Sequence, residues 1–387
     1  MAKTLTKERE PLVHIVKRGE VKKRYAYFIR ISAFILSLLI CAIVSTAITK
    51  QSFGYFFKNT IAGVFGTERR IWDAFHSMAL LLIVALAVTP AFKMRFWNIG
   101  AEGQVLMGCV GCALAMFYFT GKVPTGVLYL LMIVFSILFA VIWSVIPAIF
   151  KAKWNTNETL FTLMMNYIAT FFTGYMINIW AQGKGSGTVY FKSGYLPQVY
   201  NQFLLKIIVA AVLMVLLWIY LRYSKHGYEI SVVGESERTA KYIGINVKKV
   251  IIRTMALTGV MCGIAGLLLV GGTNHNITET TAGGRGFTAI LVSWLAKFNP
   301  LIMALTAFLV IFIQKGTGNV ATLNGLGDAY TNVMTGIFFF LIIASEFLIN
   351  YRIVFKNGNK FKKTIKGIFK KKDATTGADS ALTEVNE

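Results

Sequence analysis

A group of polar side chains stands at the start of one long apolar run. The run continues to Phe119 and opens with the string FWNIGAEGQ, whose polar members are Asn98, Glu102 and Gln104. A carboxylate at the edge of hydrocarbon costs free energy, so it favours a polar path over a lipid-facing position. Glycines on either side of Glu102 allow the backbone to unwind or to approach a ligand closely. The string therefore predicts a transport pathway, in which Glu102 either lines the path or positions helices.

A second polar group follows the turns of one predicted helix in the string NTNETLFTLMMNYIAT. Steps of three and four residues place four polar side chains on one helix face, namely Asn155, Thr159, Thr162 and Asn166. Glu158 begins a neighbouring stripe. Such groups also form hydrogen bonds between membrane helices, worth about 0.6 to 2 kcal/mol each. Path lining and helix packing therefore both stay open for these residues.

Motifs for enzyme chemistry are absent from the sequence. No G-x-x-x-x-G-K-[ST] string occurs, so the chain is not expected to hydrolyse ATP by itself. The string GTGNVA, residues 316–321, follows a membrane helix instead of a strand and is interpreted as a turn. Cys109 and Cys112 form a C-x-x-C inside an apolar helix, which indicates a helix contact and not redox chemistry. The four histidines are far apart in the sequence, so we predict no catalytic residue and no metal site.

The elements that position these residues are membrane helices. Of the 387 residues, 56% are hydrophobic, and only six are proline. Because a helix needs roughly 20 apolar residues to cross hydrocarbon, the sequence predicts an all-α polytopic membrane protein with about ten transmembrane helices. The expected spans are Ile29–Ile48, Ile71–Thr89, Ile99–Phe119, Thr125–Ile149, Glu158–Trp180, Phe203–Arg222, Val250–Gly271, Gly286–Ala296, Pro300–Gln314 and Thr331–Ile349. The eighth and ninth are short, and a break near Pro300 inside one bent segment would reduce the count to nine.

Basic residues predict the orientation. They crowd the first 30 residues and the tail after Tyr351, and the formal net charge is +23. Lys and Arg accumulate on the cytoplasmic side, so both termini are expected there, in agreement with an even number of spans. Anionic membrane lipid is a sufficient partner for this charge, and nucleic acid is not expected. We predict a basic cytoplasmic segment at 1–28, a transmembrane domain at 29–349, and a basic, then polar and disordered, tail at 350–387.

Two glycine-containing polar starts suggest an internal repeat. NIGAEGQ opens the third predicted helix, and AGGRGF, residues 282–287, opens the eighth. Helices 2–5 and 7–10 would then form an inverted repeat, an arrangement that points to a central transport site. The seventh helix carries Gly259 and Gly263 in a G-x-x-x-G pattern, with Gly266 on a neighbouring face, which predicts close packing on another helix.

The segment 223–249 is the longest predicted cytoplasmic loop between spans. Its part from Glu235 to Tyr242 can form a short helix ending near Gly244, where glycine suits a C-terminal cap. Two interpretations stay open for it, a connector lying on the surface and a docking element for a cytoplasmic protein.

Five segments in this order resemble the signature segments of permease subunits of bacterial ABC importers for nucleosides and simple sugars, which are related to ribose and branched-chain amino acid permeases. They are WNIGAEGQ, NETLFTLMMNYIA, GYEISVVGESERTAKYIGINV, MALTGVMCGIAGLL and GGRGFTAILVSWLAKFNP. The resemblance covers roughly Ile71 to Ile349. The chain departs from the family in its loop, where Gly-Glu-Ser-Glu at 234–237 replaces the frequent Gly-Glu-Asn-Pro.

The resemblance implies one half of a transmembrane dimer in the bacterial cytoplasmic membrane, paired with a second, homologous permease. Its other implied partners are cytoplasmic ATPase subunits, which bind ATP and Mg, and an external substrate-binding lipoprotein. The implied path residues are Asn98, Glu102, Gln104, Asn157, Glu158 and Asn166. The implied coupling residues to the ATPases are Gly234, Glu235, Ala240, Gly244 and Asn246. The forms NIGAEGQ and NETLFTLMMNYIA favour nucleosides as cargo. The alternatives are a simple-sugar permease and an ion-coupled secondary transporter in which Glu102 or Glu158 titrates.

Overall fold

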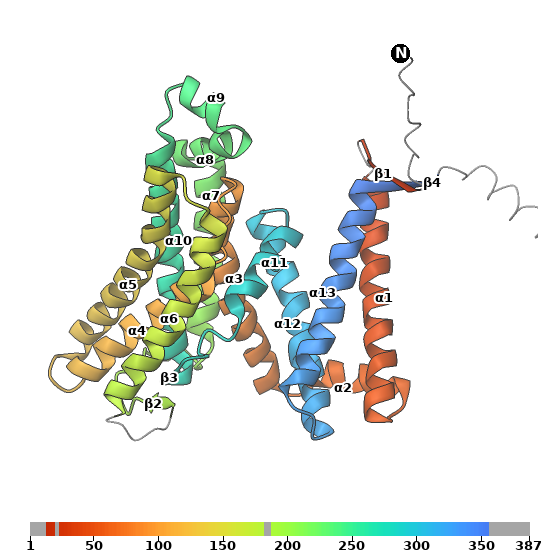
Figure 1. Ribbon diagram of the computed structural model, residues 1–387. Helices are drawn as coiled ribbons and strands as arrows, with labels where there is room; N and C mark the ends of the chain where they lie inside the picture. The colour runs from red at the N-terminus through yellow and green to blue at the C-terminus, as the bar shows by residue number, and fades with distance from the viewer. Residues whose placement is uncertain (1–12, 20–22, 182–186, 356–387) are drawn as a thin grey trace, which may run out of the picture. The chain divides into compact units, whose positions relative to one another are not determined.

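The computed structural model describes residues 13–19, 23–181 and 187–355 (Figure 1). Helices account for most of these residues, and the only strands within them are four short ones. The membrane-length helices are α1 (Lys23–Thr49), α3 (Glu68–Lys93), α4 (Ala101–Phe119), α5 (Thr125–Trp154), α6 (Glu158–Trp180), α7 (Leu204–Tyr223), α10 (Val247–Leu269), α12 (Pro300–Leu323) and α13 (Asp328–Asn350). The shorter elements are α2 (Phe53–Phe65), α8 (Lys225–Glu235), α9 (Glu237–Tyr242), the π-helical turn η1 (Val270–Asn274), α11 (Arg285–Leu295), β1 (Val13–Lys17), β2 (Thr188–Tyr190), β3 (Asn276–Thr278) and β4 (Tyr351–Phe355).

Nine helices in the described ranges are long and apolar enough to span a membrane. The all-α polytopic prediction is therefore confirmed. The eighth predicted span corresponds to α11, which has 11 residues. At 1.5 Å per residue it extends about 16 Å, only about half of the hydrocarbon thickness. The lower of the two predicted counts thus matches the full-length helices.

The ninth predicted span was too short, and the reason is the string GTGNVA. Its residues continue α12 to Leu323 and do not form a turn. Gly316 faces Thr60 of α2 so closely that a side chain at this position would collide with it. Glycine in this helix therefore serves close packing, which the sequence pattern alone did not distinguish from a break.

The chain separates into two compact units, a larger one from Ala42 to Gly336 and a smaller one from Met1–Cys41 and Ile337–Glu387. Helix α3 lies at the core of the larger unit, because every residue from Ala79 to Phe92 is buried. Helices α4, α5 and α10 pack beside it. The elements α8 and α9 lie at one end of this unit, and the antiparallel β2–β3 pair lies at the other end (Figure 1).

Helix α10 packs closely on two neighbours, as the G-x-x-x-G pattern predicted. A Cβ atom on Gly263 would lie 2.8 Å from Cα of Ile137 in α5, and one on Gly266 would lie 2.6 Å from the backbone of α4. The hydroxyl of Ser136 in α5 lies where the three helices meet. It is within 2.8 Å of the carbonyl oxygen of Gly108 in α4 and within 2.7 Å of that of Gly263. Small residues thus allow backbone contact among α4, α5 and α10.

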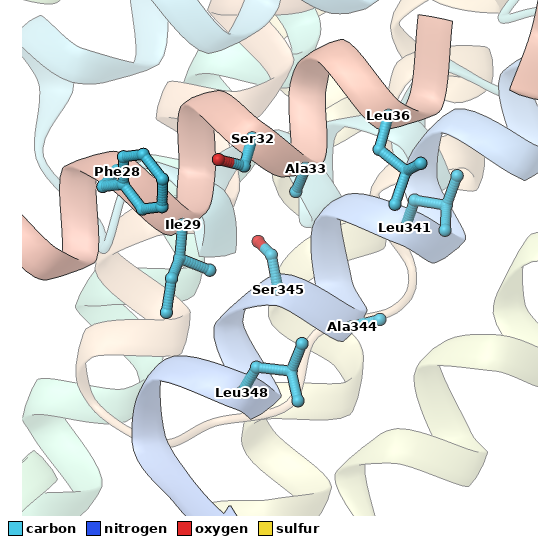
Figure 2. A pocket seen from close by; sticks show the side chains of 9 residues that line it. All are labelled: Phe28, Ile29, Ser32, Ala33, Leu36, Leu341, Ala344, Ser345 and Leu348. Atoms are coloured by element: carbon cyan, nitrogen blue, oxygen red, sulfur yellow. The ribbon is translucent and has the colours of Figure 1, made fainter. Parts of the chain in front are cut away.

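The smaller unit consists of the first part of α1, the last part of α13 and the β1–β4 pair, in which Val13 lies opposite Phe355. Arg30 forms an ion pair with Glu346 at 2.6 Å. Between the two helices lies a groove of about 290 Å³ whose lining is apolar except for Ser32 and Ser345 (Figure 2). Helix α1 begins at Lys23, earlier than predicted, and the first residues of the expected disordered tail form β4. The remainder of that tail, 356–387, lies outside the described residues.

Candidate functional site

Glu102 holds the start of one helix against the start of another. Its Oε1 accepts a hydrogen bond from the backbone N–H of Gly284, and its Oε2 accepts one from Gly286, both at 2.7 Å. The two donors belong to the first turn of α11, where N–H groups lack partners within the helix. A carboxylate there also interacts favourably with the helix dipole. Glu102 therefore positions α11 relative to α4.

The local backbone explains why AGGRGF is rich in glycine. Gly283 and Gly284 have φ angles of +63° and +70°, in the left-handed region that favours glycine. Gly286 lies directly against the backbone of Glu102, so that a Cβ atom there would collide with it. The two polar starts singled out in the sequence, NIGAEGQ and AGGRGF, thus meet in space. The inverted repeat itself stays a prediction.

Asn166 of α6 fastens the start of α4 from the other side. Its Oδ1 accepts from the N–H of Gly103 at 2.8 Å, and its Nδ2 donates to the carbonyl of Ile99 at 2.9 Å. One turn away, the hydroxyl of Thr162 accepts from the N–H of Ile99 at 3.1 Å. The predicted polar face of α6 is therefore turned toward α4 at these two positions. Both residues are buried.

Asn98 and Gln104 form a buried, hydrogen-bonded pair at the start of α4. Asn98 is 0% exposed and Gln104 is 1% exposed. Nε2 of Gln104 donates to Oδ1 of Asn98 at 3.3 Å, and Oδ1 of Asn98 also accepts from the N–H of Gly100 at 3.0 Å. Their polar groups thus form hydrogen bonds with one another and with the backbone of the turn before α4.

The other two predicted path residues lie at the start of α6. Asn157 is exposed and caps α6, its Oδ1 accepting from the N–H of Leu160 at 3.1 Å. Glu158 forms an ion pair with Lys151 of α5 at 2.9 Å. The structure therefore brings together Asn98, Glu102, Gln104 and Asn166 around the start of α4, while Asn157 and Glu158 occupy a separate place with other contacts.

A polar cavity of about 110 Å³ lies beside the start of α11, among residues that the sequence interpretation missed. Its polar lining consists of Ser77 of α3, Arg285 and Thr288 of α11, and Gln314 and Lys315 of α12. Two signals were available in the sequence. They are Arg285 in AGGRGF and Lys315, an ionisable residue directly after a predicted apolar run. The pattern could not show that three helices bring these groups to one cavity.

A buried lysine in α7 was also missed. Lys206 is 1% exposed, and its Nζ donates to the carbonyls of Gln202 at 2.5 Å and Gly272 at 2.6 Å. Gly272 belongs to η1, in which Thr273 shares a hydrogen bond with Nε2 of His76 at 3.2 Å. These contacts hold η1 against α3 and α7. Within the described ranges, no group of three or more His, Cys, Asp or Glu residues could hold a metal ion.

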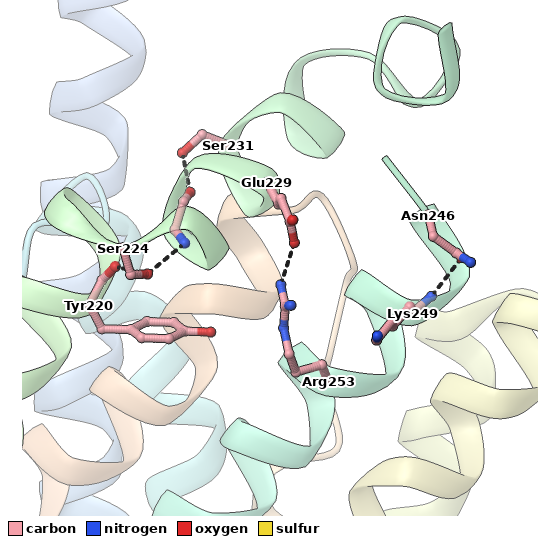
Figure 3. Close-up of polar contacts among 8 residues, drawn as sticks. Tyr220, Ser224, Glu229, Ser231, Asn246, Lys249 and Arg253 are labelled. Carbon is pink, nitrogen blue, oxygen red and sulfur yellow. Dashed lines mark hydrogen bonds and ion pairs between the residues drawn. The ribbon is translucent and has the colours of Figure 1, made fainter. Parts of the chain in front are cut away.

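Capping hydrogen bonds and an ion pair connect the parts of the segment between α7 and α10 (Figure 3). The Ser224 hydroxyl caps α8 by accepting from the N–H of Gly227 at 3.0 Å. Glu229 of α8 accepts from Nη2 of Arg253 in α10 at 2.8 Å (Figure 3). This hydrogen bond from the guanidinium lowers the pKa of the Glu229 carboxyl below its ordinary value. The ion pair ties α8 to the first turns of α10.

The predicted coupling residues divide into packed and exposed ones. Gly234 lies directly on the carbonyl of Lys93 at the end of α3, and Ala240 is fully buried. The exposed residues are Glu235, Gly244 and Asn246. The predicted short helix is confirmed as α9, followed by Gly244 with a φ of +85°, and Asn246 caps α10 by accepting from the N–H of Lys249 at 3.1 Å.

The most exposed large hydrophobic side chain of this segment was not among the predicted coupling residues. Tyr242, the last residue of α9, is 92% exposed, and Ile243 follows it at 50%. A large aromatic side chain so free of contacts suits binding to another protein.

Comparisons with known proteins agree with one another. The family described as "Branched-chain amino acid transport system / permease component" matches residues 71–343. The chain is 28% identical over 298 residues to the guanosine ABC transporter permease protein NupP of Bacillus subtilis (strain 168), covering 75% of this chain and 85% of that protein. It is 26% identical to the nucleoside ABC transporter permease protein NupB of Lactococcus lactis subsp. cremoris (strain MG1363), covering 78% and 88%.

A third relative bears the name of a sugar. The glucose ABC transporter permease protein TsgB13 of Haloferax volcanii is 24% identical, with 78% of this chain and 82% of that protein covered. No solved structure matches the chain. The family match extends over both polar starts and over the segment between α7 and α10.

Proposed function

Since this chain belongs to the family of branched-chain amino acid transport system permease components, we propose that it is the membrane-spanning permease subunit of an ATP-driven importer of nucleosides. The observation that carries the proposal is the similarity over three quarters of the chain to permeases named for guanosine and for nucleosides. The nine membrane-length helices found among the described residues and the polar groups at the start of α4 support a path for a polar solute.

The proposed assembly contains a second, homologous permease, cytoplasmic ATPase subunits that bind ATP and Mg, and an external substrate-binding lipoprotein. It lies in the cytoplasmic membrane of a bacterium. Strands β1 and β4, near the two ends of the chain, pair with each other and support one common side for both termini, which we place in the cytoplasm because their basic residues face anionic lipid there. The chain itself catalyses no covalent step. ATP binding and hydrolysis in the partners would shift it between inward-open and outward-open arrangements.

The coupling element in this proposal is α9 with the residues around it. The exposed groups Tyr242, Ile243 and Gly244 would contact an ATPase subunit, while Gly234 and Ala240 hold the element on the permease. Gly234 packs on the end of α3, and α3 also lines the polar cavity. A displacement of α9 would therefore reach the middle of the permease through one rigid helix.

In the path, the six predicted residues have two proposed roles. The starts of α4 and α11 are fixed by four of these residues, namely Glu102, Asn166, Asn98 and Gln104. In this proposal the same four residues border the passage. Asn157 and Glu158 would border it at the start of α6. Selectivity comes from the lipoprotein, so the permease needs only to replace part of the solute's hydration during passage.

Uptake by reconstituted protein tests the proposal. Proteoliposomes with the permease pair, the ATPases and the lipoprotein should accumulate radiolabelled guanosine only when ATP is supplied on the ATPase side. The matched control contains this chain alone under a proton or sodium gradient. Uptake in that control would overturn the ATP-driven mechanism and favour a secondary transporter.

A substitution tests the docking role of α9. Tyr242→Asp should abolish co-purification of the ATPase subunits, since it places a charge in an aromatic contact. Tyr200→Asp is the control. Tyr200 is 86% exposed and lies shortly before the start of α7, whereas α8 and α9 follow the other end of that helix. ATPase binding that persists in Tyr242→Asp, or that is lost equally in both variants, would contradict the role.

A simple sugar is the second candidate cargo, and the similarity to a permease named for glucose favours it. Competition decides between the two: unlabelled nucleosides should block uptake of labelled guanosine, and glucose or ribose should not. Block by the sugar at equal concentration would reverse the assignment.

A further inference from the structure

The cavity beside α11 lies about halfway along two membrane-length helices. Ser77 is the tenth of the 26 residues of α3, and Gln314 is the fifteenth of the 24 residues of α12. Each is therefore roughly 14 to 21 Å from the start of its helix. The third wall is the first turn of α11, a helix that begins inside the protein. A polar cavity at mid-depth beside an interrupted helix is the arrangement expected for a solute site.

Two polar side chains of the lining have no partner in the part of the chain that the structure describes. No hydrogen bond engages the hydroxyl of Ser77 or the side-chain amide of Gln314, and Ser77 is only 7% exposed. Gln314 is half-buried, and polar groups withdrawn from water to this extent normally find partners. In this cavity the missing partner is a solute or water, and both groups can donate as well as accept.

The charges around the cavity are balanced. Lys315 is paired with Asp73 of α3 at 2.5 Å. Nη1 of Arg285 donates to the carbonyl of Ala282 at 3.0 Å, and the carboxylate of Glu102 is bound to the N–H groups on either side of Arg285. Lys315 thus has a carboxylate partner, and Arg285 is bound to a backbone carbonyl and lies in the electrostatic field of Glu102. The cavity consequently suits a neutral solute with several hydroxyl groups better than a phosphate or another anion.

The volume limits the solute further. The cavity has a volume of about 110 Å³. It is well below the roughly 300 Å³ of a pocket that encloses a drug-sized ligand. A single sugar ring matches this size, and a complete nucleoside exceeds it.

We propose that this cavity is a sugar-ring subsite of the permease, in which Ser77 and Gln314 bind the vicinal hydroxyls of the ribose while the base remains in the wider passage. The inference rests on the proposed function for its cargo. Arg285 and Lys315 form the polar rim of the subsite. Binding is weak, since each hydroxyl exchanges water for one neutral hydrogen bond.

The test compares a ribonucleoside with its 2′,3′-dideoxy form in proteoliposomes that contain the complete importer. Each substrate is supplied with the lipoprotein saturated, so that the preference of the lipoprotein does not enter the rate. Ser77→Ala and Gln314→Leu should each lower the rate for the ribonucleoside about fivefold, the worth of one hydrogen bond. The rate for the dideoxynucleoside should stay unchanged, because it lacks the hydroxyls.

Thr322→Val is the matched control. Thr322 lies on α12, is exposed, and bonds to the carbonyl of Gly318 in its own helix at 2.9 Å, away from the cavity. It should leave both rates unaltered. Equal losses for both substrates in Ser77→Ala and Gln314→Leu, or no loss for either, would overturn the subsite.

Failure of the cargo assignment has a different signature. If the unmodified importer carries a simple sugar and no nucleoside, the same variants are compared on that sugar and its 2-deoxy form, and the selective loss for the full sugar is again required. If the unmodified importer carries neither, the proposed function and the subsite are both wrong.

Discussion

Replacement of Glu102 by glutamine tests the contact that joins the starts of α4 and α11. The carboxylate accepts two backbone N–H groups at 2.7 Å each. Hydrogen bonds to a charged acceptor contribute about 1.5 to 3 kcal/mol each, and neutral ones about 1 kcal/mol. Glutamine has one acceptor oxygen, and its NH2 group would face the second N–H donor. The variant keeps one neutral bond in place of two charged ones, a loss of about 2 to 5 kcal/mol.

The readout is local, namely amide hydrogen exchange measured by mass spectrometry on peptides covering residues 280–290. The N–H groups of Gly284 and Gly286 exchange when the first turn of α11 opens. Because 1.4 kcal/mol is a factor of ten, a loss of at least 2 kcal/mol should speed their exchange about 30-fold or more. Glu102→Asp retains the charge on a shorter side chain and should give a smaller increase.

Glu68→Gln is the control for this experiment. Glu68 also lies in the first turn of a membrane-length helix, α3, but it is exposed. Its loss should alter stability by at most about 1 kcal/mol through the helix dipole, and it should leave exchange at residues 280–290 unchanged. Unaltered exchange in Glu102→Gln would refute the role of Glu102 in joining the starts of α4 and α11 and would leave it only a path-lining role.

Two further outcomes follow from the packing and from the loop. Gly263→Val should destabilise the protein by about 1 to 3 kcal/mol or more, because its Cβ would lie 2.8 Å from Cα of Ile137. Thermal unfolding in detergent measures this loss of stability. Gly126→Val is the control and should be nearly neutral, because a Cβ atom at Gly126 meets no atom within 4 Å. The pKa of Glu229 is lowered by Arg253, so the ion pair stabilises the loop above the ordinary pKa of 4.5 and this contribution is lost as the pH falls below it. After correction for the intrinsic pH dependence of amide exchange, the protection of the α8 amides should therefore fall on acidification below pH 4.5. Glu229→Gln should lower this protection at neutral pH and remove its pH dependence; a wild-type profile in that variant would count against the pair.

Local features of the chain were predictable wherever one segment carries the signal. The apolar runs identified most of the membrane helices, the short helix before Gly244 was found as α9, and the G-x-x-x-G pattern identified the close packing of α10. The same reasoning failed at GTGNVA, where glycine allows α12 to pack on α2 and does not end it. Short elements such as α2 and α8 were missed because their apolar residues do not form a membrane-length run.

Contacts between distant segments were not predictable. Glu102 was singled out as an unusual carboxylate, yet its partners lie 182 and 184 residues further on. The cavity that contains Ser77 and Gln314 likewise depends on α3, α11 and α12 meeting. Tyr242 stood out only once its exposure was known.

The sequence by itself determined which segments of this protein avoid water, where glycine replaces larger side chains, and where polar groups interrupt hydrocarbon. Only the tertiary structure decided which face of each helix meets another helix, and hence that Glu102 binds the start of α11 and that a polar cavity lies beside it. The physical reason is that lipid and the interior of a helix bundle are both apolar. A hydrophobic pattern therefore reveals that a segment leaves water without revealing its neighbours, and these are selected by the packing of small residues and the pairing of polar groups across the fold.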